Sequence, residues 1–134
     1  MSGRLILAYG GSGSGKSAWA EQTLLSQAAR TPGGRAVYLA AMESSGPEAA
    51  ARIQRHRAMR ARHGAEVGLN FVTMERPTGI SGAPVRPGDF VLLEDLGNLL
   101  ANEIWSPTGS GPENAPAHIL EGVDTLLERV ELLL

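Results

Sequence analysis

The chain has 134 residues, of which 43% are hydrophobic and 19% charged, a balance typical of one folded soluble domain over residues 1–134. Its formal net charge of −2 excludes a strong basic field for nucleic acid, and the lack of cysteine excludes disulfides, thiolate nucleophiles and thiolate metal ligands. No apolar run is long enough for a signal-peptide core or a membrane span, so we expect a cytoplasmic protein without a nucleic-acid partner.

The first predicted elements are a buried strand over Leu5–Tyr9, a glycine-rich loop, and a helix over Ala18–Ala29. The loop, here called the phosphate loop, fits the pattern G-x-x-x-x-G-K-[ST] without a mismatch; it is Gly10-Gly11-Ser12-Gly13-Ser14-Gly15-Lys16-Ser17. Its glycines allow backbone N–H groups to converge on phosphate oxygens, and the following helix adds the positive end of its dipole. We expect Lys16 to reach the outer phosphates and Ser17 to bind Mg²⁺. A flexible Gly/Ser linker is the alternative, but linkers rarely place Lys-Ser at this spacing between a strand and a helix.

Strand-like and helix-like segments alternate along the middle of the chain. Ala36–Ala40 predicts a second buried strand, and Ser45 with Glu48 forms a capping box that starts a helix running to about Arg62. After a polar break at 63–68, residues 70–74 predict a third strand, and the Pro/Gly-rich span 76–88 predicts a loop. This alternation predicts an α/β fold with a mostly parallel sheet flanked by helices.

Two acids follow the fourth predicted strand, Phe90–Leu93. In phosphate-loop proteins an acid at the carboxyl end of a neighbouring strand orders Mg²⁺ beside the loop serine, so Glu94 is the second candidate metal ligand after Ser17. The alternative is that Glu94 and Asp95 simply end the strand. The loop upstream favours the metal role.

The remaining elements are predicted to be helical. Leu96–Trp105 predicts a short helix, and a Gly/Pro-rich loop follows over 106–116. From Ile119 onward the apolar residues repeat at helical spacing, with mainly acidic residues on the other side. This pattern predicts an amphipathic helix that continues to Leu134 and packs on the sheet.

A second group of candidate functional residues lies on the predicted helix that starts near Ser45. Arg52, His56 and Arg60 are four residues apart, so in a helix they share one face. Arginines on both sides disfavour the imidazolium, which predicts a neutral, nucleophilic His56, and they would bind the phosphates of an incoming nucleotide. From the spacing alone, a solvated basic helix with an incidental histidine is the favoured interpretation. His63 and His118 have no comparable setting, and we expect structural or surface roles for both.

These motifs, in this order, resemble the bifunctional adenosylcobinamide kinase / adenosylcobinamide-phosphate guanylyltransferases of cobalamin biosynthesis. The phosphate loop matches the family's Gly-Gly-x-x-Ser-Gly-Lys-Ser, and Tyr38-Leu39-Ala40-Ala41 matches a strand of Tyr-Ile-Ala-Thr type. Ala50 to Arg57 matches the Ala-Ala-Arg-Ile-x-x-His-Arg helix, the most specific of these stretches. A strand ending in glutamate before proline corresponds to Phe71–Pro77, and the Leu-Leu-acid segment with an asparagine eight residues on corresponds to Leu92-Leu93-Glu94 and Asn102.

The resemblance implies a P-loop NTPase (RecA-like) fold and two reactions. Adenosylcobinamide would be phosphorylated with ATP or GTP, and GMP from GTP would pass to adenosylcobinamide phosphate through a guanylyl group on His56. Lys16 would serve the phosphoryl transfer together with Mg²⁺. The implied guanine-nucleotide contacts, besides Gly10 to Ser17, are Ala40, Ala41, Met42, Arg57, Ala58, Met59, Arg60, Glu75 and Glu94.

The chain also departs from the family pattern. Gly13 and Ala41 stand where the family usually has arginine and threonine, and residues 63–69 look like an insertion. Family members continue past the Leu-rich helix into a further strand and a final helix–strand unit, so we expect a C-terminally shortened sheet and a homo-oligomer that covers its edges. Two other functions stay open: a phosphate-loop nucleotide-binding module without transferase activity, and another small-molecule kinase.

Overall fold

The structure is a computed structural model that describes residues 4–11, 14–42, 46–127 and 131–133. These residues form one five-stranded sheet in the order β1-β5-β4-β2-β3, and every paired strand is parallel. The elements are β1 (Leu5–Ile6), α1 (Lys16–Arg30), β2 (Ala36–Ala40), α2 (Gly46–Val67), β3 (Val72–Glu75), the 3₁₀ turn η1 (Ile80–Gly82), β4 (Phe90–Glu94), α3 (Leu96–Trp105), α4 (Ala115–Leu127) and β5 (Glu131–Leu133).

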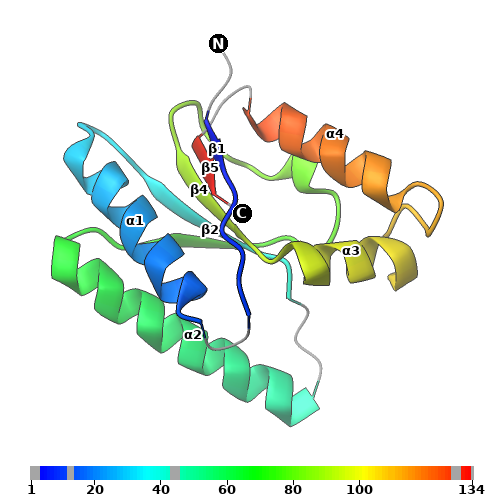
Figure 1. Cartoon of the computed structure of the whole chain (residues 1–134), viewed down its shortest axis with the longest axis horizontal. Coiled ribbons are helices and arrows are strands. Elements are labelled where there is room, and N and C mark those ends of the chain that lie inside the picture. The colour runs from blue at the N-terminus through cyan, green and yellow to red at the C-terminus, as the bar shows by residue number, and fades with distance from the viewer. Residues whose placement is uncertain (1–3, 12–13, 43–45, 128–130, 134) are drawn as a thin grey trace.

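The sheet lies between two layers of helices, with α1 and α2 on one side and α3 and α4 on the other (Figure 1). Alternate residues of β2 and β4 face opposite layers. Tyr38 and Leu92 pack with α1 residues such as Leu25, whereas Leu39 and Leu93 belong to a second cluster that also includes residues of η1, α3 and α4. Because both faces are covered, β2 and the first four residues of β4 carry mainly apolar side chains on both faces, as expected for the centre of a parallel sheet, and Glu94 ends β4.

The structure confirms the predicted α/β class. The bounds of β2 and α3 are those predicted from the sequence, and β4 extends one residue further, to Glu94. In the described part of the chain, no helix combines the length and the apolarity needed to cross a bilayer.

The prediction of a buried first strand over Leu5–Tyr9 is wrong. β1 spans only Leu5–Ile6, and Leu5, Leu7 and Tyr9 are exposed. The physical reason is its place in the sheet, since β1 is an edge strand that pairs with β5 alone. An apolar run does not reveal whether a strand will be central or at an edge.

The predicted end of the second helix near Arg62 is also wrong, because α2 continues to Val67. The polar residues expected to break the helix instead form its last turn, where His63 is buried and its Nδ1 lies 3.3 Å from Glu21 Oε1 of α1. Gly68 follows the last residue of the helix; its φ of +75° is closed to most side chains, and its N–H donates to Gly64 O. The proposed cap Ser45 lies outside the described residues.

The prediction that the last helix continues to the final residue is wrong. α4 ends at Leu127, and Glu131–Leu133 forms β5, which pairs with both β1 and β4. A short leucine-rich run fits a helix and a buried strand equally well. Here residues 131–133 form a strand because they can pair with β1 on one side and β4 on the other. Two smaller differences are a third strand at Val72–Glu75 rather than 70–74, and the 3₁₀ turn η1 inside the predicted loop, with Ile80 buried.

Candidate active site

Residues 7–15 connect β1 to α1, and the phosphate loop begins at Gly10 within this segment. Helix α1 begins at Lys16, and its N-cap Gly15 has a φ of +85°, a conformation that favours glycine. The Lys16 ammonium donates to Gly11 O at 3.3 Å, and Ser14 N–H donates to the same carbonyl at 3.2 Å. The first turn of α1 contains no acidic residue of its own. Ser12 and Gly13 lie outside the described residues.

The carboxylate of Glu94 connects the phosphate loop to the centre of the sheet. Ser17 Oγ donates to Glu94 Oε1 at 2.9 Å, and the Tyr38 hydroxyl donates to Glu94 Oε2 at 2.6 Å. Glu94 is the last residue of β4 and Ser17 is the second residue of α1, so the parallel sheet brings residues 77 positions apart into contact. A hydroxyl and a carboxylate oxygen therefore meet at the carboxyl end of the sheet, beside Lys16.

The ring of Tyr38 is held by two side chains, Arg60 and Phe71. The Arg60 guanidinium of α2 lies 3.7 Å from the ring centroid, in cation–π contact, and Phe71 packs against the ring edge at 5.9 Å between centroids. Burial raises the pKa of the Tyr38 hydroxyl, and the neighbouring Glu94 carboxylate raises it further. The hydroxyl therefore stays protonated and donates to Glu94 throughout the neutral range.

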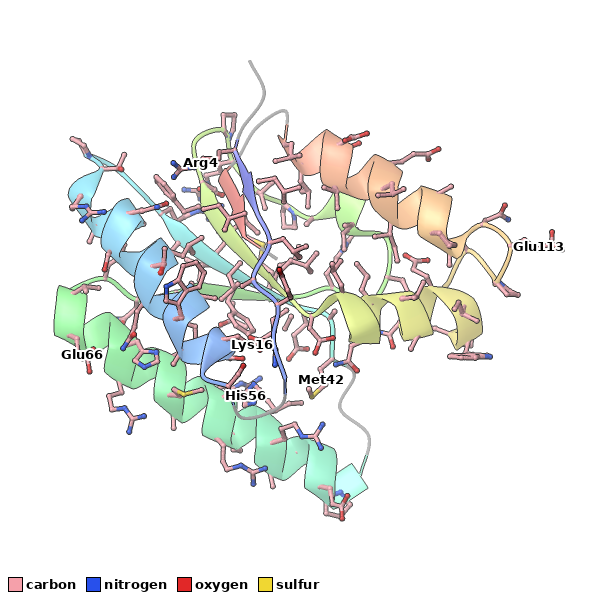
Figure 2. All side chains as sticks on the ribbon, in the orientation of Figure 1. Arg4, Lys16, Met42, His56, Glu66 and Glu113 are labelled. Carbon is pink, nitrogen blue, oxygen red and sulfur yellow. The ribbon has the colours of Figure 1, made fainter. Side chains whose placement is uncertain are left out.

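Helix α2 places His56 opposite the phosphate loop. A hollow of about 360 Å³, here called the loop hollow, is lined by Lys16, Ser17, Arg52, His56 and Glu94, among others. Lys16, His56 and Met42 lie together where α1 and α2 approach each other (Figure 2). The structure thus brings Lys16, Ser17, Glu94 and His56, predicted from separate stretches of sequence, around one space.

A second hollow lies on the far side of His56, toward β3. It is lined by His56, Arg57, Arg60 and Glu75, and it shares Met42, His56, Glu94 and Asp95 with the loop hollow. Arg57 Nη2 lies 3.3 Å from Glu75 Oε1, with both side chains largely exposed. A cleft of about 450 Å³ continues past Arg57 and Glu75 to Asn70 and Phe71. We call these two connected spaces the β3 hollow.

Not every predicted contact lines these spaces. Ala40 and Met42 do, but Ala41 is fully buried, and its carbonyl accepts from the Asn102 side-chain amide at 2.6 Å. The same amide donates to Pro77 O at 3.0 Å, so Asn102 ties α3 to the segments after β2 and β3. Ala58 and Met59 are not among the residues that line the loop hollow or the β3 hollow.

Sequence reasoning gave no individual role to Tyr38 or Asp95. Tyr38 bridges Glu94 and Arg60, and Asp95 lines both hollows while its side chain caps α3 by accepting from Asn98 N–H at 2.7 Å. A tyrosine inside an otherwise aliphatic strand was the available signal for Tyr38, since a buried hydroxyl needs a partner.

The residues present fit a Mg²⁺ ion held together with a nucleotide. Within the described ranges no three His, Cys, Asp or Glu side chains cluster so that they could hold a metal ion by themselves. Ser17 Oγ and Glu94 Oε1 instead offer two adjacent hard oxygen donors. Mg²⁺ is commonly bound by one or two protein oxygens, with phosphate and water completing its octahedral shell.

The sheet is parallel, the loop follows its first strand, and the loop serine is bonded to an acid at the end of β4, which β5 separates from β1. This combination defines the P-loop NTPase class. The family model described as cobinamide kinase / cobinamide phosphate guanyltransferase matches residues 6–132. The chain belongs to this family, whose members act in cobalamin biosynthesis as cobinamide kinases and cobinamide phosphate guanylyltransferases. A comparison with curated proteins gives no match.

Proposed function

We propose that the chain phosphorylates adenosylcobinamide with ATP or GTP, and then transfers GMP from GTP to adenosylcobinamide phosphate through a guanylyl group on His56. One observation carries this proposal. His56 lines the loop hollow together with Lys16 and Ser17, and it also lines the β3 hollow together with Arg57 and Glu75. A GTP molecule with its outer phosphates at the phosphate loop and its base near Glu75 would present its α-phosphorus to His56.

The β3 hollow suits a guanine base better than an adenine. Guanine carries N–H donors at N1 and N2 on one edge, and the Glu75 carboxylate has two acceptor oxygens that match this pair. Adenine has an acceptor at N1 and would face the carboxylate with a lone pair. Glu75 is exposed and contacts Arg57, so this arginine would hold the carboxylate in place while the base binds.

The guanylyl step is a nucleophilic displacement at phosphorus. A neutral imidazole nitrogen of His56 attacks the α-phosphorus, an N–P bond forms, and the bond to the bridging oxygen breaks, so pyrophosphate leaves with the electron pair. A phosphate oxygen of adenosylcobinamide phosphate then attacks the same phosphorus, and the N–P bond breaks. Arg52 lines the loop hollow and Arg60 the β3 hollow, where their charges would stabilise the phosphate oxygens.

The kinase step needs positioning and charge neutralisation more than covalent chemistry. Lys16 would contact the outer phosphates, and Ser17 and Glu94 would hold Mg²⁺. When bound, Mg²⁺ neutralises charge on the phosphate oxygens. The hydrogen bond from Tyr38 would hold the Glu94 carboxylate in place for this role.

The test is covalent labelling with radioactive GTP and Mg²⁺. We expect an acid-labile, base-stable GMP label on the wild-type chain and none on His56→Ala. His118→Ala is the matched control, because His118 is half-exposed on α4 and lines neither hollow. Equal labelling of His56→Ala would disprove the histidine role. GTP binding without any label on the wild-type chain would favour a nucleotide-binding module without transferase activity.

The kinase half is tested separately with ATP and adenosylcobinamide. We expect phosphorylation that Lys16→Ala abolishes and that His56→Ala retains, because phosphoryl transfer uses no histidine nucleophile. Phosphorylation of other small alcohols but not of adenosylcobinamide would assign the chain to a different acceptor.

A further inference from the structure

A third hollow lies on the outer side of the phosphate loop and has no role in the function proposed above. It measures about 470 Å³ and is lined by Leu7, Tyr9 and Trp19 together with Lys16 and other residues of the loop. The three apolar side chains are unusually open to solvent for their size, with Tyr9 86% and Trp19 50% exposed. Two aromatic rings at the mouth of a cleft have a large apolar surface to bury against a ligand.

The position of this hollow relative to the phosphate loop is fixed by short-range structure. Tyr9 directly precedes the first loop glycine. Trp19 lies in the first turn of α1, where its backbone N–H donates to Gly15 O at 3.0 Å. Lys16 and Ala8 line both this hollow and the loop hollow that contains His56. A triphosphate bound at Lys16 could therefore extend toward either space.

We propose that the hollow at Tyr9 and Trp19 binds the purine base of the nucleotide that donates its outer phosphoryl group in the kinase step. One phosphate loop then serves two base sites, one beside Trp19 for phosphoryl transfer and one beside Glu75 for guanylyl transfer. This inference rests on the proposed binding of triphosphates at the loop.

The chemistry of the lining favours a base over other occupants and predicts its specificity. Aromatic faces stack on the π-face of any base, and this contribution is largely independent of base identity. Apart from Lys16, the polar side-chain groups among the described residues of this hollow are the Tyr9 and Ser14 hydroxyls and the Trp19 indole N–H, and these residues include no carboxylate or amide side chain. The site at Trp19 should therefore accept adenine and guanine almost equally, in contrast to the site at Glu75.

Trp19 itself provides the assay. The chain has two tryptophans, and the other, Trp105, is exposed at the end of α3. In a Trp105→Phe background, titration with Mg²⁺ and the non-hydrolysable ATP analogue adenylyl imidodiphosphate should change the fluorescence of Trp19. Trp19→Ala should weaken binding of the analogue roughly ten- to hundredfold, measured by calorimetry, because it removes one stacking face. Trp19→Phe should retain most of the affinity, and Trp105→Ala should retain all of it.

Inorganic triphosphate separates base binding from phosphate binding. It has no base, so Trp19→Ala should bind it as tightly as the wild-type chain does, whereas Lys16→Ala should bind neither probe. Unchanged analogue affinity in Trp19→Ala would overturn the base site and leave the proposed function standing. An equal loss for both probes would overturn it too, because Trp19 would then act on the loop itself.

Two further results would also count against the base site. Unchanged analogue affinity in Trp19→Ala together with a changed sedimentation mass would assign the aromatic surface to contacts between copies of the chain. Failure of the wild-type chain to bind inorganic triphosphate would remove the proposed function and this inference together.

Discussion

The contact from Tyr38 to Glu94 gives the sharpest test of the site geometry. The Tyr38 hydroxyl donates to Glu94 Oε2 at 2.6 Å, and Tyr38→Phe removes this hydroxyl alone. The substituted ring would keep its place under Arg60 and against Phe71, so the variant isolates one hydrogen bond.

The magnitude follows from the charge and burial of the two partners. A hydrogen bond to a charged group contributes about 1.5–3 kcal/mol to stability. Glu94 is half-buried and keeps its bond from Ser17, so water can replace part of the lost contact at Oε2. We therefore expect Tyr38→Phe to lower the free energy of unfolding by about 1–2 kcal/mol. Because burial and Glu94 raise the pKa of Tyr38, its hydroxyl donates across the neutral range, and the loss should be the same at pH 6 and pH 8.

The measurement is urea unfolding followed by circular dichroism, with unchanged slope as the criterion that the unfolded ensembles are comparable. Tyr9→Phe is the matched control, since that side chain is exposed and its hydroxyl should matter by less than about 0.5 kcal/mol. A loss below about 0.5 kcal/mol in Tyr38→Phe would refute the reasoning, because Glu94 would then not depend on Tyr38 for its position.

Three further predictions concern stability and assembly. Glu103 is buried, and its carboxylate accepts hydrogen bonds from Gly79 N–H and Ser110 N–H. Burial raises the pKa of Glu103, but these bonds outweigh burial and lower the pKa overall. Glu103→Gln should therefore lower the free energy of unfolding by about 1.5–3 kcal/mol at pH 7. That cost should shrink as the pH falls from about 4.5 through the lower pKa of the folded state. Denaturant titrations of both proteins at pH 7 and pH 3.5 measure it, and an equal cost at the two pH values would contradict the assignment. Burial raises the pKa of Glu21, and the hydrogen bond with His63 offsets part of this increase. The folded state therefore favours the protonated carboxyl, whose contribution to stability is present below about pH 4.5 and is lost as the pH rises through the pKa of the folded state. Wild-type stability should therefore fall relative to Glu21→Gln between pH 4.5 and pH 8, and parallel thermal-unfolding profiles would rule this out. Because edge strands β1 and β3 each pair on one side only, we also propose a homo-oligomer, and sedimentation equilibrium at the mass of a single chain would exclude it.

The sequence by itself determined the elements whose signals are local. The loop from Gly10 to Ser17 carries its whole pattern within eight residues, and β2 and α3 have clear apolar runs bounded by turn or capping residues. The family resemblance was likewise predicted from motifs that are contiguous in sequence, and the match over residues 6–132 confirms it. His56 was singled out by its spacing from Arg52 and Arg60, although its chemical role stays a prediction.

Only the tertiary structure decided which of these pieces meet and which surfaces are covered. The short run at 131–133 became a strand because the sheet offers it two parallel partners, and β1 became exposed because the same arrangement leaves it at an edge. The bonds from Ser17 and Tyr38 to Glu94 join residues from three separate elements. Such contacts depend on strand order, which sequence periodicity does not encode, because it reports only which face of an element is apolar and not which neighbour will cover it.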